Sequence, residues 1–139
     1  MTTTRIAAGG WQGSLLEGSG TVSLDSSGLG TFDVTWASRA EDPQGRTSPE
    51  ELIAAAHAAC FSMSFASRLA KAGSPPTRLE TRAEVDFQPG EGITGVRLQV
   101  VGDAPGLDAD GFRELAEDAK ANCPVSKALA AVPITLTIG

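Results

Sequence analysis

Residues 48–63 read SPEELIAAAHAACFSM, and this stretch predicts the long helix around which the rest of the chain is arranged. Ser48 is a suitable N-cap, Pro49 fits the first helical position, and Glu51 at the third helical position completes a capping box. We expect the helix to run to about Ala72, because the Gly-Ser-Pro-Pro sequence that follows cannot continue it. The sequence therefore marks both ends of this helix.

The same helix is apolar on nearly every face from Leu52 to Phe65, so we expect it to be surrounded by protein. A chain of 139 residues can hardly cover such a helix alone, which indicates a dimer with the two helices buried against one another. The longest apolar run, Leu52–Phe61, is too short to span a bilayer and contains His57. We therefore expect a homodimer and no membrane partner.

Short strands, turns and smaller helices flank the long helix. The strands expected before it are Arg5–Trp11, Gly20–Leu24 and Thr31–Trp36. The elements expected after it are two alternating strands, Arg78–Phe87 and Thr94–Val101, a helix over Asp110–Ala121, a short helix starting at Cys123, and a last strand, Ile134–Ile138. The order predicts one domain over residues 1–139 of the α+β class, with antiparallel sheets packed around a long buried central helix.

Composition excludes several classes of partner and location. The chain is 41% hydrophobic and 20% charged, which is ordinary for a globular domain. Its formal net charge of -6 and the absence of a basic cluster argue against nucleic acid and anionic membranes as partners. The first residues lack the apolar core of a secretory signal. We expect a cytoplasmic protein whose thiols rest reduced, so that any disulfide is transient or catalytic.

The two cysteines, Cys60 and Cys123, are the candidate reactive groups. Thiol chemistry needs a thiolate, and an ordinary thiol with a pKa of about 8.5 is mostly protonated at neutral pH. Cys123 opens a short helix and gains from its free N–H groups, whereas Cys60 lies about three turns inside the long helix. A reactive Cys60 would need a cation, for which Arg39 and Arg46 are candidates, with a carboxylate such as Glu50 to hold the arginine.

Other interpretations of these residues remain open. A cysteine in an apolar helix is commonly a small core side chain, and Glu50 is also a favourable charge in the first turn of a helix. His57, one turn before Cys60, is more simply a core or interface histidine than a general base. Cys60, His57 and Cys123 are three potential zinc ligands, but no fourth is evident, so we expect no metal. No nucleotide, flavin or haem motif is present either, so we expect no cofactor.

Two motifs resemble those of a known family. Residues Pro49–Met63 look like the signature helix of the OsmC/Ohr family of thiol peroxidases, and Cys123-Pro124-Val125-Ser126 resembles its second cysteine motif. The spacing of the two cysteines fits, and the likeness extends from Trp11-Gln12-Gly13 to the last strand. Within the family, the sequence Ala-Ala-His-Ala-Ala-Cys, which contains His57, resembles that of the osmotically inducible branch more than that of the organic hydroperoxide resistance branch.

The resemblance implies an intertwined α+β homodimer with active sites at the subunit interface. It implies that Cys60 attacks the hydroperoxide and becomes a sulfenic acid, and that Cys123 resolves it into a disulfide. It also implies that Glu50 positions a catalytic arginine, which Arg39 matches best, with Arg46 as the second candidate. The organic hydroperoxide branch carries its arginine in the N-terminal glycine-rich segment, and the corresponding segment here contains none.

The leading prediction is therefore a cofactor-independent, thiol-dependent peroxidase. Its expected substrates are organic hydroperoxides, with hydrogen peroxide a poorer one, and its reductant would be an external dithiol of the lipoyl type or a small dithiol. Two alternatives from other classes remain: a non-catalytic dimer that senses redox state or binds an apolar ligand, and a purely structural dimer with packed cysteines.

Overall fold

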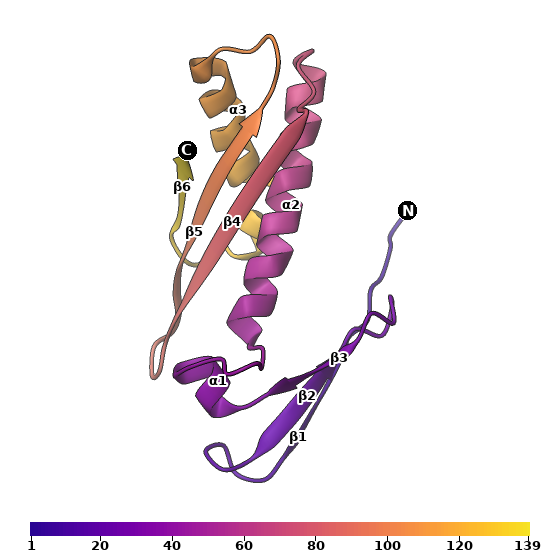
Figure 1. The fold of residues 1–139 in the computed structure, drawn as a ribbon, viewed down its shortest axis with the longest axis vertical. Coiled ribbons are helices and arrows are strands. Elements are labelled where there is room, and N and C mark those ends of the chain that lie inside the picture. The colour runs from indigo at the N-terminus through magenta and orange to yellow at the C-terminus, as the bar shows by residue number, and fades with distance from the viewer. The chain divides into compact units, whose positions relative to one another are not determined.

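The computed structural model describes the whole chain, residues 1–139, and divides it into two compact units, Met1–Glu50 and Glu51–Gly139 (Figure 1). Each unit is described by itself. Together they give the α+β class predicted from the sequence, with two small sheets and one long helix.

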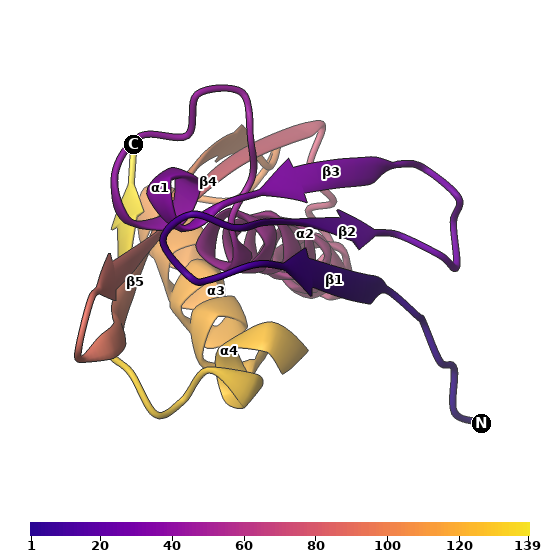
Figure 2. The ribbon, with the colours of Figure 1, turned by 90° about the horizontal axis from the view of Figure 1, so that it is seen from below.

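The N-terminal unit is an antiparallel sheet followed by a short helix. Its strands are β1 (Ala8–Gln12), β2 (Ser19–Ser23) and β3 (Thr31–Val34), in the order β1-β2-β3, and they lie side by side in Figure 2. The strand predicted over Thr31–Trp36 ends earlier in the structure, at Val34, because Trp36 already belongs to α1 (Trp36–Ala40). Thr35 and Ser38 form a capping box that starts this helix.

Gly20 is required where β1 and β2 pair. It lies opposite Trp11 in the register of the two strands. A Cβ atom at Gly20 would lie 2.3 Å from the Gly10 carbonyl oxygen and 2.7 Å from the Trp11 ring. Only glycine allows this approach, and the Trp11 ring fills the space that a side chain would take.

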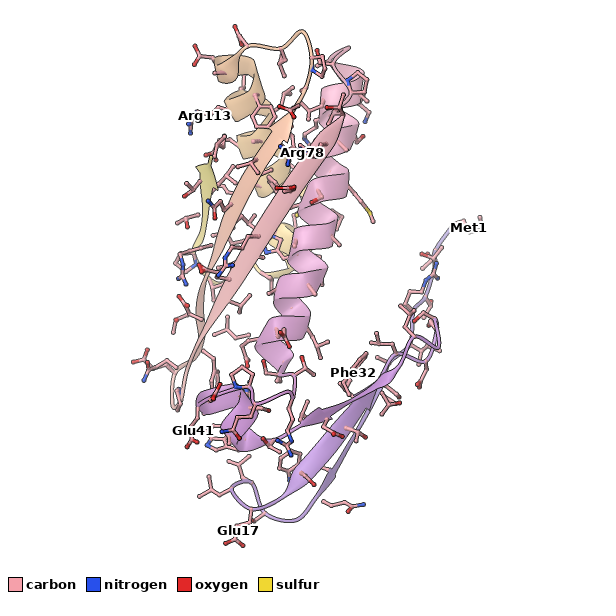
Figure 3. All side chains as sticks on the ribbon, viewed as in Figure 1. Met1, Glu17, Phe32, Glu41, Arg78 and Arg113 are labelled. Carbon is pink, nitrogen blue, oxygen red and sulfur yellow. The ribbon has the colours of Figure 1, made fainter.

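The C-terminal unit places helices on a mixed sheet of β4 (Arg78–Gln88), β5 (Gly92–Asp103) and β6 (Ile134–Ile138). Its helices are α2 (Pro49–Lys71), whose first two residues belong to the other unit, α3 (Ala109–Asn122) and α4 (Pro124–Ala128). The hairpin β4–β5 is antiparallel, as predicted, but β6 pairs parallel to β5, so the prediction of purely antiparallel sheets was wrong for this strand. The chain returns through α3 and α4 before β6, and such a crossover permits parallel pairing. Figure 3 shows the side chains, with Arg78 labelled at the start of β4.

Helix α2 buries one face in this unit and exposes another. His57, Phe61, Phe65 and Leu69, each four residues apart, are fully buried. Met63 on another face is 73% exposed. By length and composition alone α2 is able to cross a membrane, but the core helix of a soluble protein passes the same test.

The core of the C-terminal unit surrounds that buried face and contains one of the cysteines. The edge of the Phe112 ring meets Phe65, with ring centroids 4.8 Å apart. The buried members of this core are Phe61, Phe65, Leu69, Leu98, Val100, Ala116, Ala119 and Cys123. Cys123 therefore lies inside a closely packed apolar cluster.

Candidate functional site

Cys123 joins α3 to α4, and the two helix ends fix its position. Its N–H donates to the Ala119 carbonyl at 2.9 Å and closes α3, and Pro124 occupies the first position of α4. Its Sγ acts as the N-cap of α4 and accepts from the Ser126 N–H at 3.4 Å. The Cys123 side chain is fully buried.

Cys60 on α2 lies against Cys123, so the structure brings the two predicted thiols together. Cys60 packs against the core cluster that contains Cys123, and both Cys123 and the Val125 N–H act on the pKa of the Cys60 thiol. Both cysteines are free, and Cys60 is partly exposed.

The surroundings of Cys60 within its own unit oppose ionisation. Burial raises the pKa of the Cys60 thiol, the Val125 N–H lowers it, and the neighbouring Cys123 raises it through charge and hydrogen bonding. No lysine or arginine is among the groups that act on this pKa. Within this unit the Val125 N–H is the group that favours the Cys60 thiolate.

Arg39 and Glu50 form a well-defined pair in the N-terminal unit. Arg39 Nε donates to the two carboxylate oxygens of Glu50 at 3.0 and 3.3 Å, and Nη2 donates to Oε2 at 3.0 Å. Glu50 is only 6% exposed, and a buried carboxylate is costly unless it is paired with a cation or a hydrogen-bond donor. The fork geometry fixes the plane of the guanidinium as well as its position.

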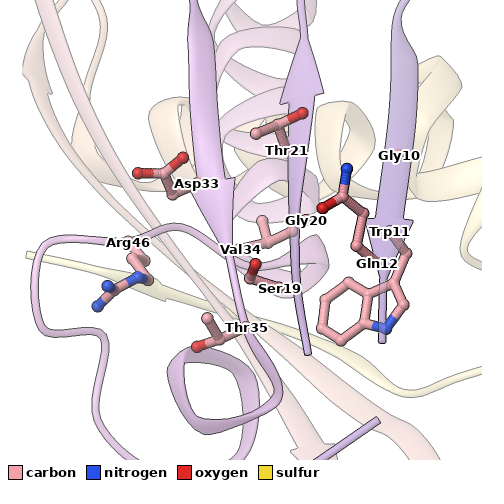
Figure 4. Close-up of a pocket in the computed structure, with 10 residues that line it drawn as sticks. All are labelled: Gly10, Trp11, Gln12, Ser19, Gly20, Thr21, Asp33, Val34, Thr35 and Arg46. Carbon is pink, nitrogen blue, oxygen red and sulfur yellow. The ribbon is translucent and has the colours of Figure 1, made fainter. Parts of the chain in front are cut away.

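Arg46, the second candidate arginine, lies in a different setting from Arg39. It lines a cavity of about 500 Å³ beside the sheet, together with Trp11, Thr21 and Asp33 (Figure 4). None of the hydrogen bonds between Glu50 and an arginine involves Arg46. Of the two candidates, Arg39 is thus the one that Glu50 orients.

A second cavity of the N-terminal unit adjoins Arg39. It encloses about 340 Å³ and is mainly apolar. Its walls are Trp11, Leu15, Val34, Thr35, Trp36, Arg39 and Pro49. A cavity of this kind offers an apolar group a place next to a fixed positive charge.

His57 and Ser126 complete the polar residues around Cys123. His57 Nε2 and Ser126 Oγ are 2.7 Å apart, and Ser126 Oγ lies 3.0 Å from Cys123 Sγ. His57 is fully buried, and burial lowers its pKa. The sequence predicted a buried histidine, but it gave Ser126 no role. The spacing of Ser126 three residues after an N-cap was the signal that pointed to contact with Cys123.

Metal ligation was the alternative role for the two thiols and His57. No three His, Cys, Asp or Glu side chains in the chain are grouped as metal ligands. The groups that adjoin Cys123 at α4 are the Ser126 hydroxyl and, beyond it, the His57 ring.

The two free thiols of this chain lie in a mixed α+β fold. Residues 41–138 match the family model described as OsmC-like protein, and the chain therefore belongs to that family, which confirms the predicted resemblance. Peroxiredoxin OsmC of Escherichia coli (strain K12) is 41% identical over 134 residues, which cover 94% of this chain and 93% of that protein.

Two further relatives come from the organic hydroperoxide resistance proteins. OhrA of Bacillus subtilis (strain 168) is 32% identical over 142 residues, with 99% of this chain and 94% of that protein covered. The crystal structure of an organic hydroperoxide resistance protein OsmC from Legionella pneumophila has a TM-score of 0.78 at 26% identity and covers 100% of this chain and 98% of its own. These names support a peroxidase-type role.

Proposed function

We propose that this protein is a cysteine peroxidase that reduces organic hydroperoxides to alcohols. The packing of the free Cys60 against the core cluster that contains the free Cys123, in a chain of the OsmC-like family, is the observation that carries the proposal. The site residues are Cys60 and Cys123 as the redox pair, with Arg39 and Glu50 as the group that activates Cys60.

The first step is attack of the Cys60 thiolate on the distal oxygen of the hydroperoxide. The O–O bond breaks, Cys60 becomes a sulfenic acid, and the alkoxide leaves as the alcohol after taking a proton. The sulfur is oxidised and the peroxide is reduced. Because the C-terminal unit raises the pKa of Cys60, the positive charge of Arg39 is needed to stabilise the thiolate and the departing alkoxide.

The second step forms the disulfide. The Cys123 thiolate attacks the sulfenic sulfur of Cys60, the S–O bond breaks, and the hydroxide takes a proton to leave as water. A dithiol then reduces the disulfide by two exchange steps and becomes a disulfide itself. We propose a separate lipoyl-type carrier or a small dithiol as this reductant. We also propose a cytoplasmic location, because thiols stay reduced in that compartment.

The apolar cavity beside Arg39 supports an organic substrate. Trp11, Leu15 and Trp36 offer surface to an alkyl or aryl group, and hydrogen peroxide has no such group to bury. We therefore propose that organic hydroperoxides react with a higher kcat/KM than hydrogen peroxide does.

The functional form is proposed to be a homodimer. Exposed apolar side chains occur on α2 and in the N-terminal unit, and a partner subunit would remove them from water. The larger ones are Trp11, Leu15, Leu16, Leu29, Phe32 and Met63. Light scattering coupled to size exclusion tests this directly, and a monomer at micromolar concentration would contradict it.

Turnover of cumene hydroperoxide with a small dithiol tests the proposed function. Wild-type protein, Cys60→Ser and Cys123→Ser are compared, with hydrogen peroxide as second substrate. We expect rapid turnover that Cys60→Ser abolishes, and a Cys123→Ser protein that stops at the sulfenic acid. Turnover no faster than the dithiol alone would refute the peroxidase and favour the redox-sensing or ligand-binding alternative.

A further inference from the structure

Three buried polar groups form a continuous chain that ends on the Cys123 sulfur. His57 Nε2 lies 2.7 Å from Ser126 Oγ, and Ser126 Oγ lies 3.0 Å from Cys123 Sγ. His57 and Cys123 are fully buried, and Ser126 is 4% exposed. Polar groups in such a place are costly unless they pair with one another.

The hydrogen bonds that link His57, Ser126 and Cys123 have a preferred donor and acceptor at each step. The second ring nitrogen of His57, Nδ1, is buried and has no hydrogen-bond partner. A buried N–H without an acceptor is rarer than an acceptor that lacks a donor, so the ring proton belongs on Nε2. Nε2–H then donates to Ser126 Oγ, which leaves the serine proton to be donated to Cys123 Sγ.

We propose that His57 and Ser126 are positioning residues that direct a hydrogen-bond donor at Cys123 and so favour its thiolate for the disulfide-forming step. This inference rests on the proposed function for the identity of that step. The thiolate attacks the Cys60 sulfenic sulfur, which is reduced while the Cys123 sulfur is oxidised, and the released hydroxide becomes water. His57 stays neutral throughout as a donor and does not take the thiol proton.

The groups packed against Cys123 leave few other means of stabilising its charge. From α2 it faces Cys60 and, through Ser126, His57. The hydrophobic core around Cys123 includes apolar side chains from α3 and the sheet, among them Ala116, Ala119 and Leu98. Burial also lowers the pKa of His57, which agrees with a neutral ring at physiological pH. The Ser126 hydroxyl and its backbone N–H are thus the donors that Cys123 receives from α4.

Matched variants test whether His57 and Ser126 act as a chain of hydrogen-bond donors to Cys123 (the donor chain) or only fill space in the core. Ser126→Ala removes the hydroxyl and Ser126→Thr keeps it. His57→Leu removes the ring donor, and His57→Gln keeps an N–H near the position of Nε2 but cannot act as a base. A hydrogen bond to a charged group is worth about 1.5–3 kcal/mol, so its loss lowers the thiolate population about tenfold or more.

The first measurement follows disulfide formation after one equivalent of cumene hydroperoxide, by rapid quench and mass spectrometry across a range of pH. We expect Ser126→Ala and His57→Leu to form the disulfide about tenfold more slowly near neutral pH and to recover at higher pH. Ser126→Thr and His57→Gln should stay close to wild type. Wild-type kinetics in Ser126→Ala, or a His57→Gln protein as slow as His57→Leu, would overturn the donor chain.

A second measurement does not depend on peroxidase activity. In a Cys60→Ser background, the ultraviolet absorbance of the Cys123 thiolate is titrated with and without Ser126→Ala. The chain contains no tyrosine, so tyrosinate does not mask this signal. We expect Ser126→Ala to move the midpoint to higher pH, and an unchanged midpoint would refute the inference. If wild-type protein does not consume hydroperoxide while the midpoint still moves, the proposed function fails and the donor chain stands.

Discussion

Replacing Arg39 by lysine keeps the positive charge but removes the fork by which Glu50 holds it. In the native pair, two nitrogens of Arg39 donate to two oxygens of Glu50, three contacts in all, between 3.0 and 3.3 Å. A lysine ammonium is a point charge on a flexible stem and does not reproduce both parallel hydrogen bonds. Arg39→Lys therefore tests orientation separately from charge.

The size of the effect follows from the lost hydrogen bond. One hydrogen bond to a charged group is worth about 1.5–3 kcal/mol, and water recovers part of it. The Arg39 side chain is 33% exposed, so we take the lower end. About 1.4 kcal/mol corresponds to a tenfold fall in the fraction of protein whose cation is correctly placed. We expect kcat/KM for cumene hydroperoxide to fall about tenfold, with partial recovery at higher pH as Cys60 ionises unaided.

Arg46→Lys is the matched control for this assay, because Arg46 makes none of the contacts with Glu50. Glu50→Gln should resemble Arg39→Lys, since it weakens the same pair from the other side. Initial rates are measured for all three variants over a range of pH. A wild-type rate in Arg39→Lys together with a tenfold loss in Arg46→Lys would refute the choice of arginine.

Three further predictions concern the fold. Phe65→Ala should lower the free energy of unfolding by about 3–5 kcal/mol, because Phe65 is fully buried against Phe112; chemical denaturation measures it, and a loss below about 1 kcal/mol would contradict the packing. Folded His57 stays neutral where the unfolded chain takes a proton, so stability should fall below about pH 6.5 by up to about 1.4 kcal/mol per pH unit. Thermal unfolding should show that this part of the pH dependence is lost in His57→Gln, and identical pH profiles would contradict it. Gly20→Ala should reduce hydrogen-exchange protection in β1 and β2, whereas Gly10→Ala, with open space at its Cβ, should not; equal protection in both would contradict the close approach.

The long helix and most strands were predictable because their signals are local. Ser48 and Pro49 mark the start of α2, and its last residue, Lys71, is one before the predicted end. The strand Ile134–Ile138 was predicted with its observed bounds. Caps, glycine and proline act over a few residues and can be recognised without knowledge of the rest of the fold.

The features that the sequence did not reveal depend on short or distant interactions. Helix α1 has five residues, too few to show a helical period, and its capping box at Thr35 was the available signal. The parallel pairing of β6 with β5 is set by the path of the chain through α3 and α4. The outward faces of α2 were predicted to be covered, and Met63 shows that one chain does not cover them.

The candidate site also contains some features that the sequence predicted and others that it did not. Cys60, Cys123, Arg39, Arg46 and Glu50 were candidates from the residues alone. The resemblance supplied their roles, which remain predictions. The structure shows the packing of Cys60 against the core that contains Cys123, and it shows the Arg39–Glu50 fork. The Ser126 hydroxyl also contacts His57, which lies far from it in the sequence, and no local pattern indicates that second contact.

The most direct test is to treat reduced wild-type protein with one equivalent of cumene hydroperoxide, without reductant, and to map its cysteines by mass spectrometry. We predict the loss of two hydrogens and a single cross-linked peptide pair containing Cys60 and Cys123. In Cys123→Ser we predict a sulfenic acid at Cys60 that a sulfenic-acid reagent traps. Unmodified thiols at Cys60 and Cys123 after complete exposure, or oxidation at Cys123 alone, would contradict the proposed peroxidase.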